Sequence, residues 1–66
     1  MKLIIDLGDR KVEESHPSEA AARQHLSTVL ISHEARGHRV AREDDATEPR
    51  YTVQTPEGRL QYWLEQ

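Results

Sequence analysis

The amino-terminal segment alternates between apolar and other positions, as a strand with one buried face does. The apolar positions that fall two apart are Leu3, Ile5 and Leu7. Gly8 and Asp9 follow, and glycine at the first central position suits a two-residue hairpin turn. We therefore predict that residues 10–14 return antiparallel, with Ile5 opposite Val12. The returning arm is polar, and its sequence is compatible with either a regular or a frayed strand.

A helix is predicted from Ala20 to about Arg36. Residues 15–19 resemble a helix start, with serines to cap free N–H groups, a proline for the first turn and a glutamate beside the helix dipole. One stripe along the helix carries the residues that face the core: Ala22, Leu26, Val29, Leu30 and His33. Arg36 in the last turn and Gly37 after it indicate where the helix ends.

Three strands are predicted after the helix, over residues 38–42, 50–55 and 59–64, with an acidic loop at residues 43–49. The register of the last two strands depends on the turn between them. A two-residue loop at residues 57–58 gathers the apolar side chains of both strands beneath the helix. It pairs Thr55 with Leu60, Val53 with Tyr62, and Tyr51 with Leu64.

A three-residue loop is the alternative, and it would pair Val53 with Gln61. It would also move the apolar residues of the last strand to the opposite face. We expect the shorter loop because a slip of one residue exposes the whole hydrophobic set.

These elements predict an α+β fold in a single domain, residues 1–66, with one helix packed on one face of a small antiparallel sheet. The order along the chain is strand, strand, helix, strand, strand, strand. The predicted core places the helix residues Leu26, Val29 and Leu30 on Leu3, Ile5, Val40, Val53, Leu60 and Tyr62.

Composition narrows the classes of function that this fold can serve. Nine Lys and Arg residues against twelve Asp and Glu residues give a net charge of −3, which is unlike that of a nucleic-acid binder or a polybasic membrane anchor. The absence of cysteine excludes disulfides, thiolate nucleophiles and Cys-based metal sites. The longest apolar run, residues 29–31, is too short to span a membrane, and the start lacks the features of a signal peptide, so we expect a cytoplasmic protein.

Candidate catalytic and metal-binding chemistry is sparse. The four histidines have no HxxxH or HxH spacing, and the least unfavourable grouping is His33 with Glu34 and His38. We expect His33 at the apolar edge of the helix and the other three histidines in solvent. The serines suit capping or exposed helix positions, and no carboxylate pair lies in an apolar setting. We therefore expect no enzyme activity, no cofactor and no metal.

Charge is distributed unevenly along the chain. A basic patch is predicted between the helix end and the following strand, formed by Arg36, His38, Arg39 and Arg42, with Arg50 close to it in one arrangement. An acidic stretch from Glu43 to Glu48 includes Asp44 and Asp45. These charges either neutralise one another across a solvated hairpin or form two opposed surfaces, one of which recognises a partner.

Trp63 is the side chain that we single out. In the predicted register it points away from the helix, beside Gln61 on the open face of the sheet, and Ile4 also points away from the helix. A tryptophan there is either covered by neighbouring side chains or an anchor for a partner.

The whole chain resembles, in size, layout and composition, the small phage-encoded inhibitors that include the anti-CRISPR proteins. The resemblance includes no motif, so it assigns no residue a role; it implies a protein that covers a surface of a host nucleic-acid-handling complex. We expect a non-catalytic module that binds a protein partner or a second copy through the open face and the charged loops. The alternative is a nucleic-acid-associated regulator that uses the basic patch.

Overall fold

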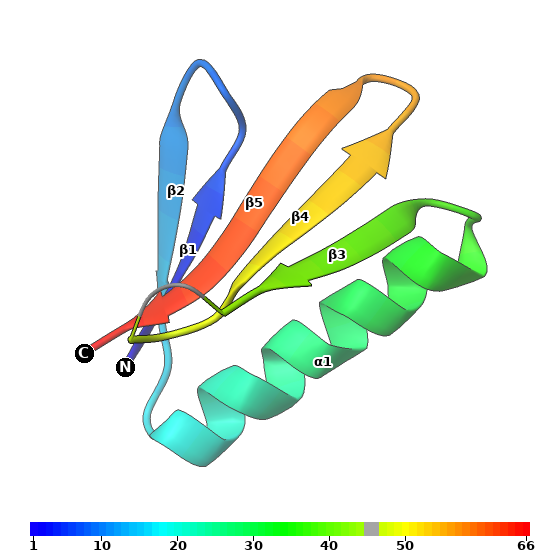
Figure 1. Cartoon of the computed structure of the whole chain (residues 1–66). Coiled ribbons are helices and arrows are strands. Elements are labelled where there is room, and N and C mark those ends of the chain that lie inside the picture. The colour runs from blue at the N-terminus through cyan, green and yellow to red at the C-terminus, as the bar shows by residue number, and fades with distance from the viewer. Residues whose placement is uncertain (45–46) are drawn as a thin grey trace.

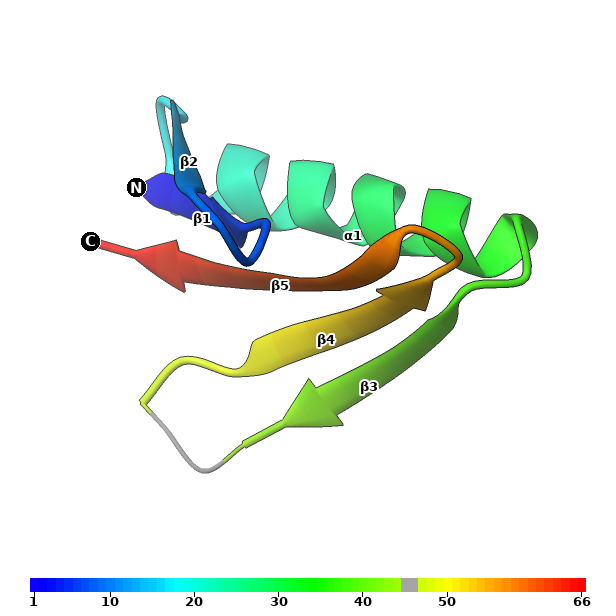
Figure 2. The same cartoon turned by 90° about the horizontal axis from the view of Figure 1, so that it is seen from above.

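A computed structural model describes residues 1–44 and 47–66 of the chain. Its elements are β1 (Lys2–Asp6), β2 (Lys11–Ser15), α1 (Glu19–Ala35), β3 (Arg39–Glu43), β4 (Arg50–Thr55) and β5 (Gly58–Glu65). The strands form one antiparallel sheet in the order β2-β1-β5-β4-β3 (Figure 1). Figure 2 shows α1 along one face of this sheet, which leaves the other face open. The predicted α+β fold is confirmed.

The first hairpin forms with the predicted register. Ile5 lies opposite Val12, and the Leu7 amide donates to the Arg10 carbonyl over 2.9 Å. Gly8 has a φ of +96°, a conformation that glycine adopts without the steric cost that a Cβ imposes. The polar second arm is a regular strand, paired with β1 along its whole length.

The helix begins and ends where the sequence indicates. The Ser18 hydroxyl accepts a hydrogen bond from the Ala21 amide over 3.1 Å, which caps the first turn. Arg36 is the C-cap, and Gly37 follows with a φ of +82°. The predicted stripe faces the sheet, although Val29 and Leu30 are only partly buried.

The predicted register between β4 and β5 is wrong by two residues. The observed pairs are Tyr51 with Tyr62, Val53 with Leu60, and Thr55 with Gly58. The loop is Pro56-Glu57, because the Thr55 hydroxyl donates to the Gly58 carbonyl over 2.8 Å and accepts from the Glu57 and Gly58 amides. Pro56 also suits the first central position of such a turn. A shift of two residues leaves every side chain on its predicted face.

The core lies between α1 and the middle of the sheet. Its buried members are Leu3, Ala22, Leu26, Val53, Tyr62 and Leu64, and packed against them are Met1, Ile5, Val29, Leu30, Val40, Tyr51 and Leu60. Every predicted core residue is in this set. Among the described residues, no helix has the length and apolar character needed to cross a membrane.

Two helix substitutions test this packing. Leu26 is 5% exposed and Ile31 is 62% exposed, so the same truncation meets opposite surroundings. We expect Leu26→Ala to lower the free energy of unfolding by about 2–5 kcal/mol. We expect Ile31→Ala to change it by about 0.5 kcal/mol or less. Urea denaturation followed by circular dichroism measures both, and equal losses would contradict the observed orientation of α1.

Candidate functional site

The face of the sheet opposite α1, which we call the open face, has a small apolar centre. Ile4 on β1 lies directly opposite Trp63 on β5, and neither belongs to the core beneath the helix. Both were predicted to point away from the helix, and they do. Trp63 is nevertheless only 6% exposed and Ile4 only 3%, so other side chains cover both residues on the open face.

Trp63 is covered by long side chains from β4, which is next to β5, and from β2, which lies beyond β1. The guanidinium carbon of Arg50 lies 4.3 Å from the centroid of the Trp63 ring, and Lys11 Nζ lies 5.6 Å from it. The indole Nε1 donates to Glu65 Oε2 over 2.9 Å. The two cations are attracted by the ring and shield its face from water with their aliphatic stems.

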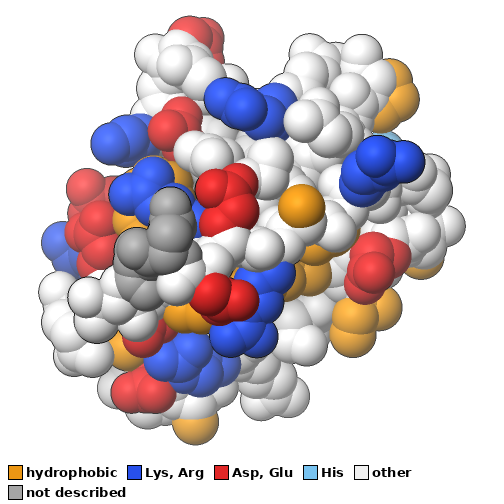
Figure 3. Space-filling model, in the orientation of Figure 1, with side chains coloured by type: hydrophobic (Ala, Val, Ile, Leu, Met, Phe, Trp, Pro, Cys, Tyr) orange, Lys and Arg blue, Asp and Glu red, His pale blue; other side chains and the backbone are white. Residues whose placement is uncertain are grey.

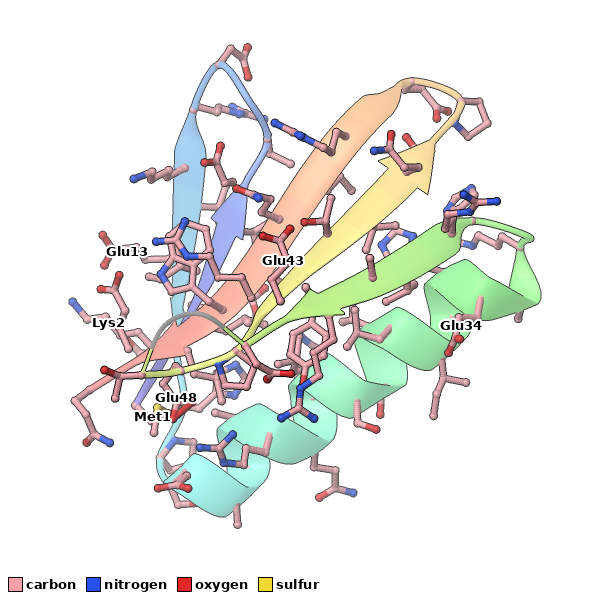
Figure 4. All side chains as sticks on the ribbon, viewed as in Figure 1. Met1, Lys2, Glu13, Glu34, Glu43 and Glu48 are labelled. Atoms are coloured by element: carbon pink, nitrogen blue, oxygen red, sulfur yellow. The ribbon has the colours of Figure 1, made fainter. Side chains whose placement is uncertain are left out.

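Side chains of both charges are interspersed on the surface that Figure 3 shows. Each carboxylate of the open face already has a hydrogen-bonding or ionic contact within the chain: Asp6 with the Gly8 amide, Glu13 with Lys2, Glu43 with Thr52, and Glu65 with Trp63. Figure 4 shows Lys2, Glu13 and Glu43 over this face. The remaining cations of the face are Lys11, Arg39, Arg50 and Arg59, and none forms an ion pair with another residue that the structure describes.

Gln61, predicted to lie beside Trp63, also lines the open face. Its amide nitrogen is 3.4 Å from the Thr52 hydroxyl. Gln61 and Arg59 border an open depression of about 200 Å³ together with Asp6 and Gly8. The depression lies between β5 and the first hairpin.

The predicted basic patch does not form as one surface. Successive residues of β3 point to opposite faces, so Arg39 lies on the open face and Arg42 on the helix side. Arg36 remains at the end of α1, and His38 is drawn inward to His33. Arg42 instead pairs with Asp44 over 2.7 Å, as expected for charges that neutralise one another. Asp45, the other acidic candidate, lies outside the described residues.

His33 links the helix to the sheet and to His38. It is 8% exposed, its Nε2 lies 2.9 Å from the Tyr62 hydroxyl, and its Nδ1 lies 2.9 Å from Nδ1 of His38. Burial lowers the pKa of His33, and the nearby charges of His38 and Arg36 lower it further. Burial raises the pKa of the Tyr62 hydroxyl. The predicted position of His33, at the apolar edge of the helix, is confirmed. His38 was expected in solvent, but it is half-buried against His33. Glu34, the third member of that grouping, is exposed on α1 (Figure 4).

A second cluster was missed at the level of sequence. Glu14 Oε1 lies 3.5 Å from His16 Nε2 and 3.2 Å from His25 Nε2. The expectation that His16 is solvated is wrong, because only 17% of its side chain is exposed. The sequence contained one indication of this cluster. Glu14 and His16 are two residues apart, so both fall on the side of β2 that faces the helix. His25 comes from α1, so only the packing of the helix reveals the cluster.

The buried histidine predicts a dependence of stability on pH. A group whose pKa is lowered by folding binds fewer protons in the native state, so the stability it contributes is present above its ordinary pKa, about 6.5, and is lost as the pH falls below that value. We expect the melting temperature to decrease between pH 7 and pH 5, and to decrease less in His33→Gln. Differential scanning calorimetry at both pH values measures this, and an equal decrease in both proteins would contradict the assignment to His33.

No protein-family model matches this chain, and no curated protein or solved structure matches it either. What the protein does is therefore inferred from its own surfaces and side chains.

Proposed function

We propose that this chain is a non-catalytic module that binds an acidic segment of a protein partner on the open face of its sheet. One observation carries the proposal: the carboxylates of that face have contacts within the chain, whereas Lys11, Arg39, Arg50 and Arg59 have no ion-pair partner among the described residues. The face thus offers donors to carboxylates from outside. Arginine is suited to this role because its planar guanidinium can hold a carboxylate with two hydrogen bonds.

Trp63 contributes by positioning Arg50. The guanidinium lies over the indole ring at 4.3 Å, and a stacked guanidinium keeps its N–H groups directed outward in its own plane. Arg50 is therefore held in place before a partner arrives, which lowers the entropy cost of ordering it on binding. Ile4 supports the same arrangement from β1, directly opposite Trp63.

The mixture of charges favours a protein segment over a nucleic acid. Four carboxylates are interspersed with the cations of the open face and would repel a phosphate backbone, whereas a short acidic segment can be placed between them. The net charge of −3 also opposes the binding of a nucleic acid. The alternative of a nucleic-acid regulator depended on the basic patch, and the alternation along β3 divides that patch between two faces.

The resemblance to small phage-encoded inhibitors extends the proposal. The partner would then be a protein of a host nucleic-acid-handling complex, and this chain would act by covering part of its surface. The cytoplasm is the proposed location of the interaction. A chain with no cysteine depends on no oxidising compartment for its stability.

Charge reversals on opposite sides of the protein test the proposal. Immobilised wild-type protein and the variants Arg50→Glu, Arg59→Glu and Arg36→Glu are incubated with nuclease-treated lysate of the source cell, and retained proteins are quantified by mass spectrometry. We expect wild type and Arg36→Glu to retain the same acidic protein. Each open-face reversal should lower its retention at least about tenfold, and added salt should weaken it.

Arg59→Glu is included because Arg59 does not cover Trp63, so its effect is independent of any change around the indole. Tryptophan fluorescence checks that Arg50→Glu leaves the ring buried. Equal retention by all variants would refute the proposal. Retention that occurs only in a parallel lysate without nuclease would favour a nucleic-acid ligand and refute the proposal. A dimer weakened by Arg50→Glu would identify the occupant as a second copy.

A further inference from the structure

The cluster of Glu14, His16 and His25 has the composition and spacing of a metal site. We propose that these three side chains bind a Zn²⁺ ion. One potential ligand atom from each residue lies within 4.8 Å of the other two. The residues come from β2, from the segment after it, and from α1, so the cluster exists only in the folded chain.

The distances fit a tetrahedral ion. Nitrogen and oxygen ligands bind Zn²⁺ at about 2.0–2.2 Å, which separates two ligand atoms of a tetrahedron by about 3.3–3.6 Å. Glu14 Oε1 lies 3.5 Å from His16 Nε2 and 3.2 Å from His25 Nε2. Both separations are close to the edges of such a tetrahedron. The ligand atoms of the two histidines lie within 4.8 Å of each other, and the 43% exposed side chain of His25 has room to close this third edge.

Two of the ligand atoms have no other hydrogen-bonding role among the described residues. Among the described residues, the buried atoms Glu14 Oε1 and His16 Nε2 have no hydrogen-bond partner, and their contacts with each other and with His25 are ion pairs only if the imidazoles are protonated. Buried polar atoms of folded proteins are nearly always satisfied, because each unsatisfied one costs stability. A bound cation satisfies both atoms at once. The backbone also fixes one ligand, because the His16 amide donates to the Met1 carbonyl over 2.9 Å.

The ligand set selects the kind of ion. Two imidazoles and one carboxylate suit Zn²⁺ and its transition-metal neighbours, whereas Mg²⁺ and Ca²⁺ require mostly oxygen ligands. Three protein ligands leave one tetrahedral position for water or for a group from a partner.

Such an ion would join two parts of the fold that share few contacts. Within the part of the chain that the structure describes, β2 is an edge strand paired with β1 alone, and the ion would tie it to α1. Small domains without disulfides gain much from a structural metal, and this chain has 66 residues and no cysteine.

The experiment uses the metal alone as the probe. The chain is freed of metal with EDTA, dialysed, and titrated with ZnCl₂ by isothermal calorimetry. The variants are His25→Ala and, as a matched control at the adjacent exposed helix position, Gln24→Ala. We expect one Zn²⁺ per chain in wild type and in Gln24→Ala, and at least about tenfold weaker binding in His25→Ala. Zn²⁺ at about 100 times its Kd should raise the melting temperature of the first two proteins by about 5 °C or more.

Two further measurements locate the ion. His38→Ala removes the other histidine pair, so binding must persist in it if Glu14, His16 and His25 are the ligands. NMR of the imidazole nitrogens in the wild-type chain needs no substitution and should show Zn²⁺ shifting His16 and His25 but not His33. Equal affinity in His25→Ala and Gln24→Ala, or loss of binding in His38→Ala, would overturn the proposal. So would the absence of binding by wild type, in which case Glu14 only forms ion pairs with the two imidazoles.

Discussion

The pairing of β1 with β5 is the interaction on which the rest of the structure depends. It joins the first strand to the last at the centre of the sheet, and its side chains contribute to both faces of the sheet. Leu3 opposite Leu64 faces the helix, and Ile4 opposite Trp63 faces outward. The cost of closing a loop of nearly the whole chain grows only slowly with its length, so a few buried pairs can offset it. Without this pairing, the first hairpin would have no attachment to the core sheet.

Much of the fold follows from the two periods in the sequence. The helical stripe and its caps predicted α1 nearly to the residue, because Ser18 and Gly37 act locally. Alternation predicted which side chains share a face, and it did so even where the register between β4 and β5 was wrong. The pattern of apolar residues fixes only whether a shift is odd or even. The hydrogen bonds of the Thr55 hydroxyl decide between registers that differ by two, and no hydrophobic pattern contains that information.

The candidate sites were less accessible from the sequence. The direction of Trp63 could be predicted, but not the side chains that cover it, because Lys11 and Arg50 reach it from two other strands on opposite sides of β5. The prediction of the basic patch was wrong for a different reason, because successive residues of a strand point to opposite faces of the sheet. Clusters such as Glu14 with His25 depend on where the helix crosses the sheet, and that crossing is set by packing rather than by any local signal.

The two edges of the sheet affect how the protein behaves at high concentration. β2 and β3 are the strands with an unpaired side, and each carries charges at most of its positions. An exposed edge can template the addition of another chain, and charged side chains along it oppose the close approach that such addition requires. Edge-to-edge growth into fibres is thereby disfavoured. Both edges of the sheet therefore oppose polymerisation by strand addition.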